Sequence, residues 1–317
     1  MLNFSDVFND CTSDGTKIKT EDYLQEGKYA IIDQGQKEIA GYTNREDGVY
    51  TDVPAIIFGD HTRVIKYVNQ PFYLGADGVK LLKSKLSDAN YKYLYYALKN
   101  YRIPNTGYNR HFKWLKQAEI EYPSKEIQNK VVIELDKITT IIQMKNNQLA
   151  ELDNLIKSRF IEMFGDPISN SKGLETTDLI NVVKLQRGYD LPVQDRVQDG
   201  DIPVFGSNGA LDNHNEAKVI GGGVITGRSG SIGKVYYTEE DYWPLNTSLF
   251  SVDLHGNNIV YLAYLLELFD LSRFADGTGV PTLNRNNVHN KQIINVPVEE
   301  QIVFADFVKQ VNKSKFD

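Results

Sequence analysis

The feature that most constrains this chain is an internal repeat. Five segments have counterparts later in the chain in the same order, and the separation between counterparts stays between about 168 and 174 residues. Five ordered matches at a nearly constant separation are hard to obtain by chance, so we infer two copies of one domain of about 120 residues. Identity within the matches is low, which makes a shared fold a firmer inference than a shared ligand. The matched segments are KYAIIDQGQKEIAGY (28–42) with DIPVFGSNGALDNHN (201–215), PAIIFGD (54–60) with GGVITGR (222–228), NYKYLYYAL (90–98) with NIVYLAYLL (258–266), NTGYNRHFKWL (105–115) with DGTGVPTLNRNNV (276–288), and YPSKEIQNKVV (122–132) with VPVEEQIVFADF (296–307).

Each copy contains short runs that are typical of strands, separated by Gly, Asn and Asp turns. The runs are YAIID, PAIIF and TRVIKYV in the first copy, and IPVF, GGVIT, KVYYT and SLFSVDL in the second. A short helix is predicted after them in each copy, over roughly 89–101 and 257–269. The chain is therefore predicted to be an α+β protein built from two small β-rich domains.

A long helix is predicted between the copies, beginning after Pro123 and ending at the stop signals Gly165-Asp166-Pro167. Its apolar residues recur every three or four positions, with one step of seven, which is the period of a coiled-coil seam. The alternative is an amphipathic helix packed on its own domain. The seam residues are Ile127, Val131, Leu135, Ile138, Ile142, Leu149, Leu152, Ile156, Phe160 and Met163.

The second copy begins a similar helix after Pro297, with Ile302, Phe304, Val308 and Val311 on one stripe. Two helices at equivalent positions can pair as an antiparallel coiled coil and hold the domains apart. At about 1.5 Å per residue the first helix would be roughly 55–60 Å long. This length is comparable with about one and a half to two turns of B-DNA, each of which is about 34 Å long. The second helix has about half that length, so we expect either a truncated chain or completion by a second copy. The predicted domains are 1–124, 125–165, 166–296 and 297–317.

Charge is distributed unevenly along the 317 residues, although the net charge of −7 alone argues against a nucleic-acid partner. No acidic residue lies between Asp88 and Glu119 or between Asp276 and Glu299, whereas basic residues occur in both gaps. Such local basic stripes in an acidic chain suggest a bounded contact surface, here for double-stranded DNA. The sequence shows no membrane span and no signal peptide, so a soluble cytoplasmic protein is expected.

The acid-free segments supply the candidate DNA contacts. Arg and Lys can anchor phosphates, and Asn and Arg have the bidentate geometry that reads adenine or guanine edges. The alternative for any single residue is a core tyrosine or a solvated lysine. In the first copy the candidates are Lys92, Lys99, Arg102, Asn105, Thr106, Asn109, Arg110, His111 and Lys113, and in the second copy they are Arg187, Tyr189, Arg228, Ser229, Thr278, Asn284, Arg285, Asn286 and Asn287.

Catalytic motifs are not recognisable. GGGVITGRSGSIGKV (221–235) fails the phosphate-loop pattern, because Arg228 replaces the first glycine and Val235 follows Lys234. Asn69-Gln70-Pro71-Phe72 lacks the double proline of amino-methyltransferases, and no glycine-rich methyl-donor loop precedes it. The single cysteine, Cys11, and five scattered histidines form no zinc pattern, so no metal is expected.

The arrangement as a whole resembles the specificity subunit of type I DNA restriction-modification enzymes. The motifs that carry the resemblance are SRFIEMFGDP (158–167), GRSGSIGKV (227–235) and GTGVPTLN (277–284) shortly before VPVEEQ (296–301). The first copy departs from them, with Gly59-Asp60-His61 in place of Gly227-Arg228-Ser229.

The resemblance implies a non-catalytic subunit in which each domain reads one half of a split DNA target. The helices would set the spacer and dock two adenine-methyltransferase subunits. It also implies that S-adenosylmethionine, ATP and Mg are bound by the methyltransferase and restriction subunits and that this chain holds no cofactor. The alternatives are a self-contained methyltransferase or nuclease, a coiled-coil scaffold for protein interactions, and a truncated or silent specificity allele.

Overall fold

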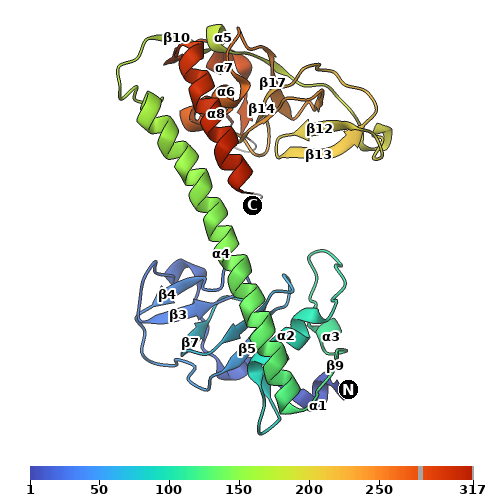
Figure 1. Ribbon diagram of the computed structural model, residues 1–317. Coiled ribbons are helices and arrows are strands. Elements are labelled where there is room, and N and C mark those ends of the chain that lie inside the picture. Colours follow the sequence, from blue (N-terminus) through green and yellow to red (C-terminus); the bar gives the residue numbers. More distant parts are fainter. Residues whose placement is uncertain (278–280, 316–317) are drawn as a thin grey trace. The chain divides into compact units, whose positions relative to one another are not determined.

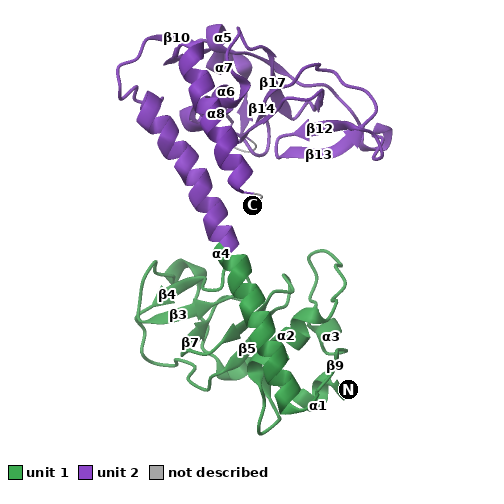
Figure 2. Ribbon diagram, viewed as in Figure 1, with its two compact units in different colours: residues 1–144 green, residues 145–317 purple. Residues whose placement is uncertain are grey.

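The computed structural model describes residues 1–277 and 281–315 and divides into two compact units, residues 1–144 and 145–317 (Figure 2). The boundary falls inside helix α4 (Lys125–Phe164), which is the long helix expected between the two copies. Each unit therefore contains one part of this helix in addition to its own sheets.

Unit 1 consists of three small sheets, with strand orders β2-β8-β5-β6, β4-β3-β7 and β1-β9. All neighbouring strands are antiparallel except β3 and β7, which pair in parallel. Its elements are β1 (Leu2–Asn3), α1 (Phe4–Val7), β2 (Phe8–Asp10), β3 (Tyr29–Ile32), β4 (Gly41–Thr43), β5 (Ala55–Gly59), β6 (Ile65–Val68), β7 (Phe72–Leu74), β8 (Val79–Ser84), α2 (Tyr91–Asn100), α3 (Phe112–Leu115), β9 (Glu119–Ile120) and the first part of α4, with short 3-10 turns at Thr12–Asp14 and Thr20–Asp22.

Unit 2 repeats this arrangement. Its sheets have the orders β11-β17-β14-β15, β13-β12-β16 and β10-β20, and a short hairpin β18-β19 is added. Its elements are the last part of α4, β10 (Thr176–Asp178), α5 (Leu179–Val182), β11 (Lys184–Arg187), β12 (Ile202–Gly206), β13 (Gly209–His214), β14 (Gly223–Gly227), β15 (Val235–Thr238), β16 (Trp243–Pro244), β17 (Ser248–Asp253), α6 (Ile259–Phe269), β18 (Ala275–Asp276), β19 (Thr282–Leu283), α7 (Arg285–His289), β20 (Gln292–Ile294) and α8 (Val298–Ser314), with 3-10 turns at Val193–Asp195 and Leu271–Phe274.

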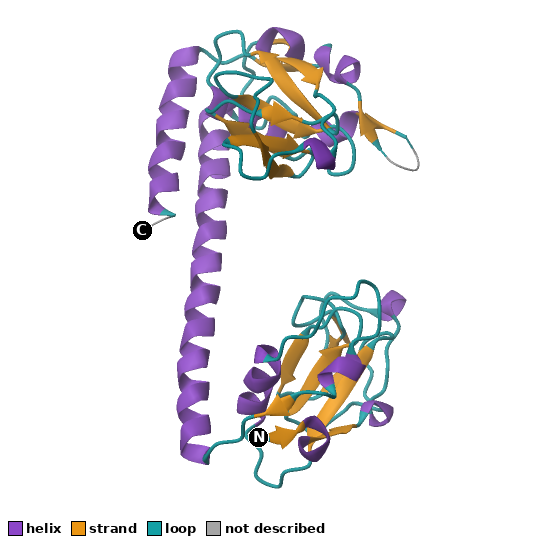
Figure 3. Ribbon diagram, turned by 90° about the vertical axis from the view of Figure 1, so that its right-hand side faces the viewer, coloured by secondary structure: helices purple, strands orange, loops and turns teal. Residues whose placement is uncertain are grey.

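The two strand orders are identical once each element is matched to its counterpart (Figure 1). The parallel pair β3–β7 corresponds to β12–β16, and the four-stranded sheets correspond strand by strand. The mixture of helix and sheet in both units is visible in Figure 3. The predicted α+β fold with two copies of one domain is confirmed.

The short helices begin at equivalent caps. Asn90 accepts a hydrogen bond from the Tyr93 amide at the start of α2, and Asn258 accepts from the amides of Val260 and Tyr261 at the start of α6. An asparagine in this position satisfies amides that the helix itself leaves unpaired. The repeat therefore extends from strand order to the side chains that begin each helix.

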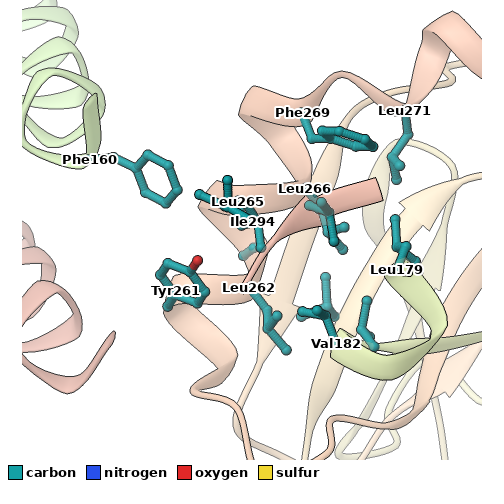
Figure 4. Packing of buried hydrophobic residues seen from close by; sticks show 14 of the residues in the cluster. Phe160, Leu179, Val182, Tyr261, Leu262, Leu265, Leu266, Phe269, Leu271 and Ile294 are labelled. Carbon is teal, nitrogen blue, oxygen red and sulfur yellow. The ribbon is translucent and has the colours of Figure 1, made fainter. Parts of the chain in front are cut away.

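The core of unit 2 surrounds α6, whose buried face includes Tyr261, Leu262 and Leu265. Figure 4 shows Phe160 of α4 facing this side of α6. Phe160 stacks on Tyr261, with ring centroids 5.7 Å apart, and meets Phe304 of α8 edge to face at 5.3 Å. Such aromatic pairs add to the free energy gained by burying the rings, so α4, α6 and α8 form one packed group.

Helix α8 runs antiparallel to the last turns of α4 within unit 2. Phe304 contacts Phe164 near the end of α4, whereas Lys315 forms an ion pair of 2.6 Å with Asp153 two to three turns earlier. The α8 residues that face the core are Gln301, Phe304, Val308 and Val311. Ile302, which was also predicted for the seam, does not belong to this buried face, because the residue is 47% exposed.

The predicted seam residues of α4 have different surroundings in the two units. Val131 packs on the core of unit 1, and Ile156 and Phe160 are buried in unit 2, where Leu152 and Met163 pack against the core. Leu135 is half-buried in unit 1. Ile138 and Ile142 of unit 1 and Leu149 of unit 2 are exposed, so the described residues leave them without a partner helix.

Candidate nucleic-acid interface

A pocket of about 300 Å³ in unit 2 brings together four of the predicted contact residues, Arg187, Arg228, Asn284 and Arg285. Asn286, which was also predicted, completes the polar wall, and Leu249 and Thr282 line the remainder. Arg187 and Arg285 are almost one hundred positions apart in the sequence. The fold therefore concentrates guanidinium and amide groups from three separate segments in one place.

Backbone pairing explains how these segments meet. Arg187 is the last residue of β11 and lies opposite Leu249 of the neighbouring strand β17. Arg228 follows β14, and its amide donates to the Thr247 carbonyl at 2.9 Å. The Leu283 amide donates to the Arg228 carbonyl at 2.8 Å, which fixes the start of α7 beside Arg228. Asn284 caps α7 by accepting from the Asn286 amide at 3.0 Å.

The pocket is electrostatically positive, because its lining contains three arginines and no carboxylate. Within the described residues, none of these three arginines has an acidic partner within 4 Å. The positive charge also affects the pKa of the neighbouring His289. Burial lowers the pKa of His289, and the positive charges of Arg285 and Lys184 lower it further.

Of the four other predicted residues of unit 2, three lie among the described residues. Ser229 pairs with Thr282 through the backbone. Asn287 donates to the carboxylate of Asp276 and, with Asn286, lines an adjacent hollow that also contains Lys291. Tyr189 is 37% exposed and is held by backbone hydrogen bonds to Pro244 and Asn246. Thr278 lies outside the described residues.

In unit 1 the predicted loop 105–110 is exposed throughout. Asn105, Thr106, Asn109 and Arg110 belong to it; Asn109 donates to the Thr106 carbonyl, and the Asn105 carboxamide accepts from the Gly107 amide at 3.2 Å. At the tip of the loop Tyr108 is 87% exposed and stacks on His61, with centroids 4.7 Å apart. His61 was not among the predicted contacts.

One of the unit 1 predictions needs correction. His111 is fully buried, where Nδ1 lies 3.0 Å from the Asp60 carbonyl and Nε2 lies 3.3 Å from the Thr106 hydroxyl. The His111 ring therefore holds the loop in place through Thr106 and is not accessible to a ligand. Lys92 pairs with Asp136 of α4, and 40% of its side chain is exposed, so its role as a DNA contact stays a prediction.

The pair formed by Lys92 and Asp136 joins α2 to α4. The Tyr96 hydroxyl donates to the same carboxylate at 2.7 Å. Burial raises the pKa of Asp136, but the hydrogen bonds from Lys92 and Tyr96 and the charge of Lys92 outweigh it and leave the pKa below its ordinary value.

The remaining basic candidates of unit 1 are exposed. Lys99 donates to the Tyr95 hydroxyl at 3.1 Å and lines a hollow with Arg63, a cation that the sequence did not single out. Lys113 lies over the Trp114 ring at 4.0 Å, and Arg102 is exposed. These cations do not converge on one pocket as the arginines of unit 2 do.

Sequence reasoning missed Thr282 and Leu249 of the arginine pocket. Thr282 belongs to the acid-free segment that supplied Asn284 and Arg285, so the same signal could have included it. Leu249 is an apolar strand residue and gives no sequence signal for a binding pocket.

Neither a membrane helix nor a metal cluster is found in the part of the chain that the structure describes. No helix there is long and apolar enough to cross a membrane. No group of three or more His, Cys, Asp or Glu side chains there is arranged to hold a metal ion.

The fold and the pocket define a class of protein with two tandem β-rich domains, each followed by a proline-led helix, and a polar, acid-free pocket in the second domain. A family profile described as the type I restriction modification DNA specificity domain matches residues 2–154 and 171–317. Because these two matches cover nearly the whole chain, the protein belongs to this family.

Individual relatives are more distant. The specificity subunit of the type I restriction enzyme EcoR124I/EcoR124II from Escherichia coli is 30% identical over 139 residues, which is 39% of this chain. The match spans about a third (34%) of that relative's length. The crystal structure of a type I restriction-modification S subunit from M. genitalium is 17% identical, with a TM-score of 0.52 over 99% of this chain and 94% of that one, and shares the fold. The HsdS subunit of Thermoanaerobacter tengcongensis has a TM-score of 0.40 at 13% identity, over 98% of this chain and 86% of that one.

Proposed function

We propose that this chain is the sequence-specific DNA-recognition subunit of a type I restriction-modification complex. Unit 1 would read one half of a bipartite target and unit 2 the other half. The observation that carries the proposal is the convergence of Arg187, Arg228, Asn284 and Arg285 in one acid-free pocket of a domain that the family profile covers. Arginine and asparagine are the side chains that contact phosphates and purine edges most readily.

The chemistry is assigned to partner subunits. In this proposal the chain is not an enzyme by itself and binds no cofactor. Adenine-methyltransferase subunits would hold S-adenosylmethionine and dock on the helices, and restriction subunits would use ATP and Mg. The long helix α4 would set the spacer between the half-sites. The complex would bind double-stranded DNA in the cytoplasm.

A second candidate function is a protein-interaction scaffold, and one observation favours it. Ile138 and Ile142 lie on α4, and about half of each residue is exposed. Exposed apolar residues of this kind are typical of a surface that binds another protein. A scaffold, however, gives no reason for one pocket to hold three arginines that have no acidic partner among the described residues, so we prefer DNA recognition.

Co-expression of the chain with the methyltransferase subunit of its own system, followed by mapping of methyladenine across the host genome, tests the function. We expect a split target of two parts. Exchange of residues 282–287 should change one part, and exchange of residues 105–110 should change the other. Stable co-purification without methylation would favour a silent or truncated allele, and absence of co-purification would favour the scaffold.

A further inference from the structure

The pocket of unit 2 holds three positive charges that the chain itself does not balance. Arg187, Arg228 and Arg285 have no acidic partner within 4 Å among the described residues, and the strongest contact of the Arg228 guanidinium is a long one of 3.5 Å to the Asn246 carbonyl. Some other cations of the same unit are paired, such as Arg196 with Asp212 at 3.4 Å and Lys157 with Glu267 at 2.8 Å. Like charges brought together without a counter-charge repel one another.

Two carboxylates close in sequence to the pocket already have hydrogen-bond partners. Asp190 accepts from the side chain of Asn246, and Asp276 accepts from the side chain of Asn287. Neither lines the pocket. A ligand that offsets the repulsion must therefore come from outside the chain and carry negative charge.

The donors in the pocket suit oxygen atoms of a phosphate. A guanidinium presents its N–H groups in a planar fork that matches a pair of phosphate oxygens. Asn284 uses its side-chain oxygen to cap α7, which leaves its amide NH₂ as a further donor at the pocket wall. An anionic oxygen is favoured here over the base edge of guanine, because one edge engages only one guanidinium.

The same place in unit 1 is built differently. Asp60 stands where Arg228 stands, directly after the central strand, and Phe112 stands where Arg285 stands, at the first position of the short helix. Asp60 is buried and accepts from the Phe112 amide at 2.7 Å. By strand register the counterpart of Arg187 is Thr12, because Asp10 lies opposite Leu82 of β8 in the way that Leu185 lies opposite Ser251 of β17. Unit 1 therefore has a carboxylate, an aromatic ring and a hydroxyl at the positions where unit 2 has its three arginines.

We propose that Arg187, Arg228 and Arg285 together seat a single phosphodiester of the DNA backbone, and that unit 1 has no equivalent seat. This inference rests on the proposed function and goes further by assigning a ligand atom to the pocket. It makes the arginine pocket the anchor that fixes the register of unit 2 on the duplex and leaves base reading to its neighbours. Arg285 then holds a phosphate, in contrast to the base-reading role that the sequence suggests for it.

The salt dependence of binding to a random-sequence duplex tests the proposal without knowledge of the target. Each neutralised phosphate contributes about 0.9 to the slope of log Kobs against log salt. The variants are Arg187→Gln, Arg228→Gln, Arg285→Gln and the triple variant, all in the full chain. Because the three side chains share one phosphate, we expect the triple variant to lower the slope by about 0.9 in total and each single variant by no more.

A matched control removes an unpaired cation of unit 2 outside the pocket. Lys218 is exposed, lies over the Trp243 ring at 4.6 Å and has no acidic partner within 4 Å among the described residues. Lys218→Gln should leave the pocket's contribution to the slope intact, so the triple variant made on a Lys218→Gln background should lose the same amount. The triple variant should also unfold at no lower temperature than the wild type, since it relieves repulsion.

Inorganic phosphate supplies the second measurement. It should raise the unfolding temperature of the wild type and of Lys218→Gln, and it should fail to raise that of the triple variant. If the salt slope of the triple variant equals that of the wild type, the arginines do not bind a DNA phosphate, even if free phosphate still binds. DNA recognition by the chain would remain possible in that case. A loss of about 2.7 shows three separate phosphates and also overturns the proposal. A chain that binds no duplex, but whose protection by phosphate disappears in the triple variant, overturns the DNA function and keeps an anion pocket.

Discussion

The backbone amide of Asn258 donates a hydrogen bond of 2.8 Å to Oε1 of Gln301, and this glutamine is completely buried. Its Nε2 donates to the Val296 carbonyl at 2.8 Å and to the Asn257 side chain at 2.7 Å. One polar side chain of α8 thus satisfies the start of α6 and the segment that leads into α8 itself. A buried amide of this kind stabilises only when its hydrogen bonds are complete.

We predict that Gln301→Leu lowers the free energy of unfolding of unit 2 by about 3 kcal/mol, because it leaves the Asn258 amide and the Val296 carbonyl buried without partners. The matched position in unit 1 is Gln128, whose Nε2 donates to the Pro123 carbonyl at 2.8 Å. Its Oε1 is buried without a partner among the described atoms. Gln128→Leu should therefore cost only about 1 kcal/mol.

Tryptophan fluorescence during urea unfolding separates the two measurements. The chain has two tryptophans, Trp114 in unit 1 and Trp243 in unit 2. Trp114→Phe leaves a reporter of unit 2, and Trp243→Phe leaves a reporter of unit 1. Equal losses for Gln301→Leu and Gln128→Leu would show that the hydrogen bonds at Gln301 do not set its contribution.

The aromatic group around Phe160 gives a contrasting pair of substitutions. Phe160→Ala removes a fully buried ring that contacts Phe164, Tyr261 and Phe304, and it should cost about 3–5 kcal/mol. Tyr261→Phe should be neutral or slightly stabilising, because the Tyr261 hydroxyl is buried and has no hydrogen-bond partner among the described atoms. Thermal unfolding followed through Trp243 distinguishes the two. A cost above about 1 kcal/mol for Tyr261→Phe would indicate a hidden partner of the hydroxyl.

The pH dependence of unit 2 should contain a contribution from His289. Its Nε2 accepts a hydrogen bond from the Leu185 amide at 3.0 Å, which requires the neutral ring. Burial, followed by the charges of Arg285 and Lys184, lowers its pKa in the folded state. The unfolded chain therefore binds the proton more readily, and the stabilisation is complete above about pH 6.5 and is lost as pH falls through the lower folded pKa.

His289→Gln tests this contribution, with the unfolding temperature of unit 2 measured between about pH 5 and pH 8. The wild type should lose stability toward acid more steeply than the variant. Arg285→Gln removes one of the charges that lower the pKa, so its acid slope should lie between the two. Identical pH profiles for wild type and His289→Gln would exclude the histidine as the titrating group.

The sequence predicted local structure well where the signal was itself local. The short helices were expected over 89–101 and 257–269 and are found at Tyr91–Asn100 and Ile259–Phe269. The seam of α8 was less accurate, because the apolar Ile302 was chosen and the polar Gln301 was not. The packed face has the spacing 301, 304, 308 and 311, and a hydrophobic pattern passes over a glutamine whose burial depends on its hydrogen bonds.

The sequence predicted most of the residues of the site, but it did not predict that they lie together in one pocket. Acid-free segments pointed to Asn284 and Arg285, yet only the pairing of β11, β17 and β14 brings Arg187 and Arg228 to them. The same reasoning included His111, which is buried. Its polar side chain is indistinguishable in sequence from those of its exposed neighbours. Exposure depends on tertiary packing, which the composition of a loop does not specify.

The last prediction concerns Asp60, the unit 1 counterpart of Arg228. Its carboxylate accepts from the Phe112 amide at 2.7 Å, while its own carbonyl accepts from the His111 amide at 2.7 Å. Asp60→Ala removes the first of these bonds and leaves the amide at the start of α3 without its acceptor, so unit 1 should lose about 1–3 kcal/mol. Asp60→Asn keeps a carbonyl oxygen at the same place and should lose less than half as much. Urea unfolding reported by Trp114 measures both, and equal losses would mean that the charge of Asp60, and not its role as an acceptor, stabilises the loop above it.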